Sequence, residues 1–241
     1  MADGNSVLIT FAGLKMSAEG TRAWTDALAA AALPTVGHTY AIRGPLDDDG
    51  SYDRFADFKD LGDQVKALAG HFTEDSDRLV VVAHSSGSFM AHRFFDGYLM
   101  HDPGPVAVRV VYYNVDGAKG PSDAAIKKLF ANAYAVHAVC KRDGKKYRSK
   151  NAGSSEELGQ HLEKLQRGTA LRSEEACPDE VVDKVVEAAA HKNEGWLLHF
   201  SLINHVDLLQ PGATSGRLKL GDDIYKKCTR ENVTADYLRG R

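Results

Sequence analysis

The stretch LVVVAHSSG, residues 79–87, decides the fold of this chain. Its first five residues, Leu79–Ala83, are all apolar and three of them are β-branched valines, which is typical of a buried strand. Phe89–Leu99, which follows almost at once, has apolar residues at helical spacing. A Ser-Ser-Gly sequence separates the two segments. The stretch therefore predicts a strand, a very tight turn and a helix.

Within this turn, Ser85 has small residues at the two positions that a tight strand-to-helix turn crowds. Ala83 stands two residues before it and Gly87 two residues after it. If Ser86 were the central residue, His84 would occupy a crowded position, which a His fits badly. Ser85 is therefore predicted to be an exposed nucleophile at the turn, although Ala83 stands where a glycine is more common.

Strand-like and helix-like segments alternate on both sides of this turn. The expected strands are 7–11, 39–42, 79–83, 106–115, 133–140 and 196–203, and the expected helices are 17–33, 52–72, 89–99, 124–131, 156–166, 180–191 and 222–238. This alternation predicts an α/β fold with a mostly parallel central sheet flanked by helices. Residues 1–241 are expected to form a single domain, with a helical insertion at about 144–195 that covers the site.

Composition narrows the possible partners. The 241 residues are 43% hydrophobic and carry a net charge of −3, so the chain as a whole has no electrostatic bias toward nucleic acid or membrane. We find no apolar run of membrane-spanning length and no secretory signal in the polar first residues. The three cysteines are far apart and odd in number, which favours reduced thiols in the cytoplasm, and one bridge between two of them is the alternative. No cofactor or metal is expected, because no metal-ligand spacing, dinucleotide fingerprint or phosphate loop is present.

A serine nucleophile needs a base, an acid and an oxyanion hole. His205 follows the expected strand 196–203, where the base of such a triad belongs, whereas His199 lies inside that segment and is interpreted as a core histidine. Two aspartates follow strands in the window between nucleophile and base: Asp116 and Asp143. Either could orient the imidazole.

The expected oxyanion hole combines two backbone amides. One belongs to Ser86, directly after the nucleophile, and the other to Gly13 or Leu14, which follow the first strand. Gly13 would allow a close approach of the backbone to a substrate.

These pieces resemble the lipases of the α/β-hydrolase superfamily. The sequence NHVDLLQPG at 204–212 looks like the histidine loop of the pancreatic-lipase-like branch, and VDGA at 115–118 resembles its acid loop. Most α/β-hydrolases carry the acid after the later strand, which favours Asp143, but this likeness favours Asp116. The Ala-Gly-Leu at 12–14 lacks the His-Gly start that is usual in this branch. The resemblance implies an α/β-hydrolase fold and cleavage of a carboxylic ester through an acyl-enzyme on Ser85, without a cofactor.

The primary hypothesis is thus an esterase or lipase acting on a small-molecule ester or a lipid. An acyltransferase or thioesterase with the same triad is the alternative, as is a non-catalytic ligand-binding module on a hydrolase scaffold. Six of the ten residues at 141–150 are Lys or Arg, which predicts a solvated loop or a site of attraction for anionic substrates.

Overall fold

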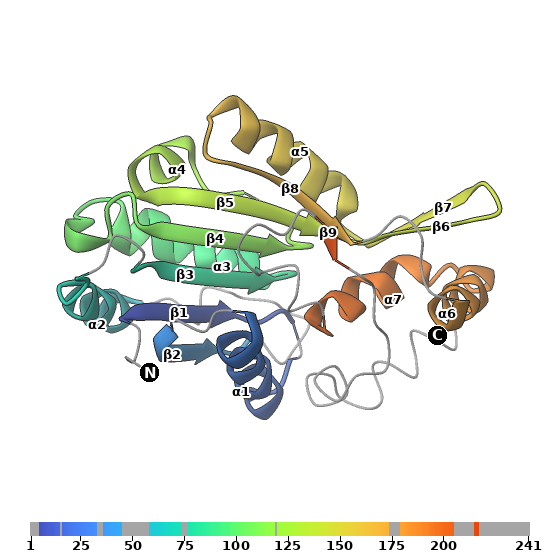
Figure 1. The fold of residues 1–241 in the computed structure, drawn as a ribbon, viewed down its shortest axis with the longest axis horizontal. Helices are drawn as coiled ribbons and strands as arrows, with labels where there is room; N and C mark the ends of the chain where they lie inside the picture. The colour runs from blue at the N-terminus through green and yellow to red at the C-terminus, as the bar shows by residue number, and fades with distance from the viewer. Residues whose placement is uncertain are drawn as a thin grey trace.

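A computed structural model describes residues 5–14, 16–32, 36–44, 58–73, 77–118, 120–173, 179–204 and 215–216. Its main feature is one sheet in the order β2-β1-β3-β4-β5-β8-β9, in which every neighbouring pair of strands is parallel. Helices flank this sheet (Figure 1). The expected α/β class, with a mostly parallel central sheet between helices, is confirmed.

The elements follow one another as expected over much of the chain. The strands are β1 Ser6–Phe11, β2 Val36–Ile42, β3 Leu79–His84, β4 Val110–Val115, β5 Phe130–His137, β6 Val139–Arg142, β7 Lys145–Arg148, β8 Gly168–Ser173 and β9 Ser215–Gly216. The helices are α1 Ala18–Ala27, α2 Lys59–Ala69, α3 Gly87–Phe94, α4 Asp123–Leu129, α5 Ala152–Lys164, α6 Asp179–Ala190 and α7 Glu194–Ser201. Short π-helical turns extend α1 and α3, and 3₁₀ turns lie at Gly104–Val106 and Leu202–Asn204.

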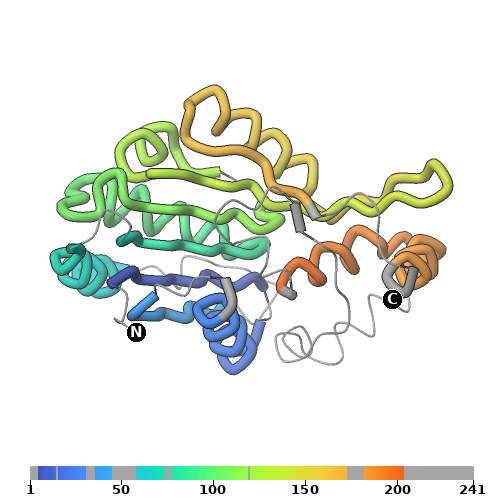
Figure 2. Tube along the Cα trace, in the orientation of Figure 1, coloured from blue at the N-terminus to red at the C-terminus, as the bar shows by residue number. Residues whose placement is uncertain are grey.

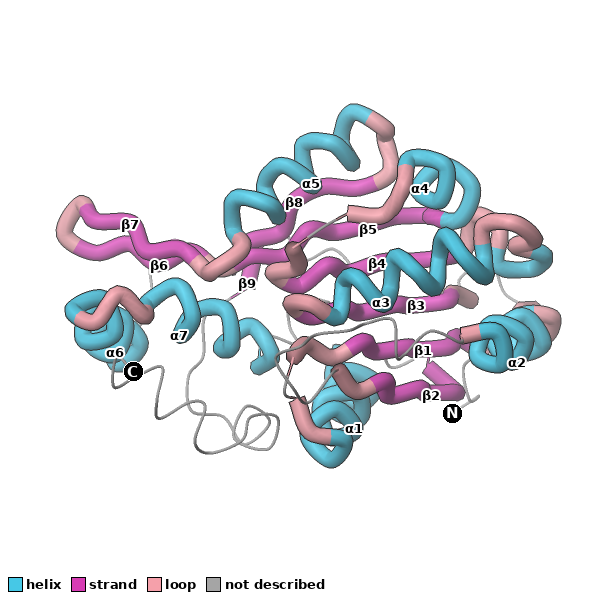
Figure 3. The backbone as a smooth tube through the Cα atoms, turned by 180° about the vertical axis from the view of Figure 1, so that it is seen from behind, coloured by secondary structure: helices cyan, strands magenta, loops and turns pink. Residues whose placement is uncertain are grey.

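Two hydrophobic cores lie on the two faces of the sheet, because alternate residues of each strand point to opposite sides. On one face, Leu8 and Val80 pack with residues of α1, α6 and α7. On the other, Ile9 and Val81 pack with residues of α2, α3, α4 and α5. Figures 1 and 3 view the sheet from opposite sides, and α3 lies in front of it only in Figure 3. The central strands are therefore buried on both faces, which is why they read as continuous apolar runs.

One expected strand is a helix. The segment 196–203 was predicted as the last strand, but it belongs to α7 and the 3₁₀ turn that follows. A short apolar run fits a buried strand and a buried helix equally well. Here Leu197, Leu198, His199 and Ser201 are all buried, so the helix has no polar face that would have revealed its period.

The segment at about 144–195 is also more than a helical insertion. Besides α5 and α6 it contains β7 and β8, and β8 lies in the central sheet beside β5. The expected strand 133–140 is divided between β5 and β6, and β6 leaves the sheet to form a hairpin with β7. Helix α5 contacts β5 and β8, so it is one of the flanking helices of the sheet. The expected helix 222–238 lies outside the described residues.

Cys140, which is buried in β6, is disulfide-bonded. Neither of the other two cysteines, Cys177 and Cys228, lies within the described residues. The expectation of reduced thiols is therefore wrong for Cys140.

Within the described part of the chain, no helix combines the length and apolar character needed to cross a membrane.

Gly87 lets the start of α3 approach the end of β1. A Cβ atom on this glycine would lie 2.2 Å from the carbonyl oxygen of Phe11. Backbone atoms cannot yield as a flexible side chain can, so the turn after β3 depends on a residue without a side chain at this position.

We expect Gly87→Ala to lower the free energy of unfolding by about 1–3 kcal/mol, because the added methyl group forces the strand and helix apart. Gly97→Ala is the matched control, since a Cβ at Gly97 has nothing within 4 Å. Urea unfolding followed by circular dichroism measures both variants. Equal stability of the two would show that the close approach at Gly87 does not constrain the fold.

Candidate functional site

The candidate site lies where the strand order of the sheet reverses. The chain runs from β1 outward to β2 and then returns to β3 on the other side of β1. In open parallel sheets such a reversal leaves a crevice beyond the carboxyl ends of the two strands, where ligands bind. Gly13 and Leu14 follow β1 at this crevice, and Ser85 and Ser86 follow β3.

Ser85 has a backbone conformation that few non-glycine residues adopt. Its φ is +56°, and it stands between the last residue of β3 and the first residue of α3. Its N–H donates a hydrogen bond of 3.0 Å to the carbonyl of Val115 on the neighbouring strand β4. The Cβ of Ser85 lies 2.9 Å from where a Cβ of Gly13 would be. The predicted tight turn is thus present, and the loop after β1 lies directly against it.

The structure also brings together the expected oxyanion-hole residues. The N–H of Leu14 donates a 2.9 Å hydrogen bond to Oγ of Ser86. In this state the Leu14 amide is engaged by a hydroxyl group, and a substrate oxygen would take the place of that hydroxyl to use the amide. Gly13 is buried beside the same turn.

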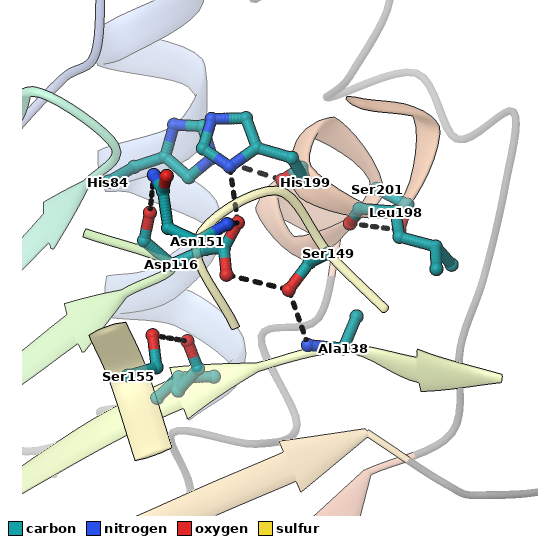
Figure 4. Close-up of polar contacts among 10 residues, drawn as sticks. His84, Asp116, Ala138, Ser149, Asn151, Ser155, Leu198, His199 and Ser201 are labelled. Atoms are coloured by element: carbon teal, nitrogen blue, oxygen red, sulfur yellow. Dashed lines mark hydrogen bonds and ion pairs between the residues drawn. The ribbon is translucent and has the colours of Figure 1, made fainter. Parts of the chain in front are cut away.

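Asp116 is a buried carboxylate held by three donors, two from the loop between β7 and α5 and one from α7 (Figure 4). It follows β4 with φ +45°, and its side chain has no exposed surface. Ser149 Oγ donates to Oδ1 at 2.6 Å, while the N–H of Asn151 and Nδ1 of His199 approach Oδ2 at 3.1 and 2.5 Å. Burial alone would raise the pKa of Asp116, but these donors outweigh it and lower the pKa below its ordinary value. Asp116 therefore remains ionised.

Asp143, the other predicted acid, is not in this network. Asp143 lies at the turn of the β6–β7 hairpin with 91% of its side chain exposed, and its carboxylate lies 3.9 Å from Arg142. Its position at an exposed tip explains why it does not orient a buried imidazole. His205 lies outside the described residues.

The imidazole that pairs with Asp116 belongs to His199, in the middle of α7. Because a carboxylate only accepts, Nδ1 carries a hydrogen, and in the neutral form of the ring Nε2 then presents a lone pair. Nε2 is buried and has no hydrogen-bond partner among the described residues. This is the tautomer that a general base requires. Nε2 does not hydrogen-bond Oγ of Ser85 here.

His84, which directly precedes Ser85, packs against His199. Their ring centroids are 4.6 Å apart, and Nε2 of His84 donates to the main-chain carbonyl of His199 at 3.1 Å. Burial, reinforced by the neighbouring His199, lowers the pKa of His84 to about 3. His84 is thus neutral and links α7 to the strand that carries Ser85.

Sequence reasoning missed three members of this network: His199, Ser149 and Asn151. His199 was interpreted as a core residue of a strand, and recognising 196–203 as a helix would have placed it at the carboxyl edge of the sheet. Ser149 and Asn151 carry no motif. A weak signal was their position just after the Asp-Gly turn of a predictable hairpin, where β7 returns to the sheet edge.

Within the described residues, no three His, Cys, Asp or Glu side chains converge to hold a metal ion. Comparisons of the chain with protein-family models, with curated protein sequences and with solved structures found no match. The site must therefore be interpreted from its own geometry.

The burial of His84 has a consequence for stability. A histidine with a folded-state pKa near 3, against 6.5 for the ordinary residue, binds a proton more readily when the chain is unfolded. The contribution of neutral His84 to the free energy of unfolding is therefore complete above pH 6.5 and is lost progressively as the pH falls toward 3. We expect His84→Gln to reduce the slope of unfolding free energy against pH, between pH 6 and 4, by up to about 1.4 kcal/mol per unit.

Urea unfolding of both proteins at several pH values measures this slope. His137, whose pKa burial also lowers, contributes equally to wild type and variant, so the difference isolates His84. Parallel pH profiles would show that His84 takes up a proton in the folded protein.

Proposed function

We propose that the chain is a serine hydrolase that cleaves a carboxylic ester through an acyl-enzyme on Ser85. The observation that carries the proposal is the left-handed turn at Ser85, which stands between a buried strand and a helix at the crevice of the sheet. A backbone of this kind is costly for a serine and is found where function requires it.

The surroundings of Ser85 fit this chemistry. Asp116 follows β4, the strand next to β3, and holds an imidazole in the tautomer of a base. Two backbone segments approach the serine where an oxyanion would form, at Gly13–Leu14 and at Ser86. Together with the parallel sheet, this arrangement favours the α/β-hydrolase fold over other α/β folds.

In the proposed reaction, Oγ of Ser85 attacks the ester carbonyl and its proton passes to the base. The amides of Ser86 and of Leu14 or Gly13 stabilise the oxyanion, and the alcohol leaves with the proton from the base. Water then attacks the acyl-enzyme and gives its proton to the base. The bond between the acyl group and Oγ of Ser85 breaks, the acid is released, and Oγ takes the proton back from the base.

We assign the base to His199, because it is the imidazole that Asp116 orients. His205 is the competing candidate. For His199 to act, its Nε2 and Oγ of Ser85 must come closer than they are here, and such hydrogen bonds commonly tighten only when substrate binds.

The nucleophile is tested with a fluorophosphonate probe and with p-nitrophenyl esters. Wild type should be labelled at one site, which mass spectrometry of the labelled peptide assigns to Ser85. Ser85→Ala should lose labelling and about 10⁴-fold or more in ester turnover, whereas Ser86→Ala should still be labelled. A wild-type protein that is not labelled would favour the binding module. Labelling without ester hydrolysis would favour transfer to another acceptor or a thioester substrate.

The acid and the base are tested with two pairs of variants. Asp116→Asn should lower the rate about 10⁴-fold and Asp143→Asn should leave it unchanged, because the exposed Asp143 has no imidazole to orient. His199→Asn should be as inactive as Ser85→Ala, and His205→Asn should retain activity. Full activity of His199→Asn together with loss in His205→Asn would move the base to His205 and leave the nucleophile assignment intact.

The cysteine count favoured the cytoplasm, but the disulfide at Cys140 is typical of an oxidising compartment. The expectation of a cytoplasmic protein therefore loses the support of its cysteines.

A further inference from the structure

The β6–β7 hairpin is a two-stranded ribbon that extends beyond the carboxyl edge of the sheet (Figure 2). Asp143 and Gly144 form its turn, with φ of +51° and +75°, which is the backbone of a tight hairpin turn. The two flanking strand positions on each side are exposed and basic: Lys141, Arg142, Lys145 and Lys146.

The register of this hairpin places like charges opposite each other. Lys141 pairs with Lys146, and Arg142 pairs with Lys145. Directly opposed like charges destabilise an antiparallel pair, and an isolated two-stranded ribbon has little stability to spare. A partner with several negative charges would relieve this repulsion.

The two faces of the ribbon differ in how far the protein itself compensates this charge. On the face toward α6, Arg142 lies 3.4 Å from Asp183, and Lys145 lines the same hollow. Lys141 and Lys146 lie on the opposite face, because alternate residues of a strand point to opposite sides. Neither Lys145 nor Lys146 forms an ion pair with the described residues, so the tip retains excess positive charge.

The base of the ribbon is firmly attached. Ala138 and Ser149 exchange hydrogen bonds across it, and Ser149 also donates to Asp116. Next to it, the ammonium group of Lys150 lies 5.2 Å from the ring centroid of Trp196 in α7. The tip is therefore presented from a fixed base beside the candidate site.

We propose that this basic tip binds an anionic lipid surface peripherally. A protruding tip matches an extended surface better than a single small anion. The hollow of about 510 Å³ beside the hairpin is lined by Asp143, Asp183 and Glu187 as well as by Arg142 and Lys145, so its acidic and basic side chains largely offset each other and it is a poor site for a single small anion. Val186, 45% exposed on α6, lines the same hollow and adds the apolar contact that interfacial binding uses.

The test is co-sedimentation with vesicles of phosphatidylcholine alone or with 30 mol% (about one lipid in three) phosphatidylserine, the composition that supplies the surface charge. Wild type should bind only the anionic vesicles, and binding should be lost in roughly 0.5 M salt, which screens charges beyond a few ångströms. K145Q/K146Q should bind about 30-fold more weakly, as expected when two lysines near a charged surface are neutralised.

K127Q/K128Q is the matched control, because Lys127 and Lys128 are two adjacent exposed lysines on α4, at the other end of the sheet. It should bind like wild type. Removing Lys146 relieves the repulsion with Lys141, so the hairpin variant should be no less stable than wild type, which urea unfolding checks. Equal loss in both variants, or binding to uncharged vesicles, would overturn the proposal. Binding to polyglutamate without binding to vesicles would also overturn it and point to an acidic protein.

Binding to anionic vesicles does not depend on the proposed hydrolase activity. Vesicle binding by Ser85→Ala measures the surface alone, so loss of catalysis and loss of lipid binding are distinguished.

Discussion

The buried charge of Asp116 is the constraint on which the organisation of the site depends. A carboxylate without exposed surface is tolerated in a protein only if hydrogen bonds replace the water that it has lost. Its three donors come from two segments: Ser149 and Asn151 lie in the loop between β7 and α5, and His199 lies in the middle of α7. These segments must therefore meet at the end of β4, and their meeting draws α7 against the strand that carries Ser85. The position of His84, whose ring packs at a tilt against His199, follows from the same arrangement.

Much of the sheet could be predicted from the sequence, because parallel strands buried on both faces leave continuous apolar runs such as Leu79–Ala83. The turn at Ser85 could be predicted as well, since steric crowding dictates the small residues beside it. The segment 196–203 could not be assigned, because a helix buried on most sides and a buried strand look alike over eight residues. Strand β8 was missed for the opposite reason. Ala170 and Leu171 are the only apolar residues in it, so it has no apolar run that would indicate a strand.

The partners of Asp116 illustrate a different difficulty. Ser149 and His199 lie 33 and 83 residues away from it in sequence. No local pattern records a hydrogen bond over such a separation. The Asp143-Gly144 turn, by contrast, is a strong local hairpin signal, and giving it more weight would have placed Asp143 at a hairpin tip and removed it from the list of acids.

The order of the strands also has a consequence for how the chain reaches its native state. β1 lies between β2 and β3, so residues 7–11 are fully paired only after residues 79–83 have been synthesised and have crossed over. Every neighbouring pair in the main sheet is parallel, and each needs a long connection before any pairing energy is gained. We therefore expect slow folding. Until β3 pairs with it, the N-terminal strand β1 exposes unpaired N–H and C=O groups along one edge, and these groups can pair with other unfolded chains.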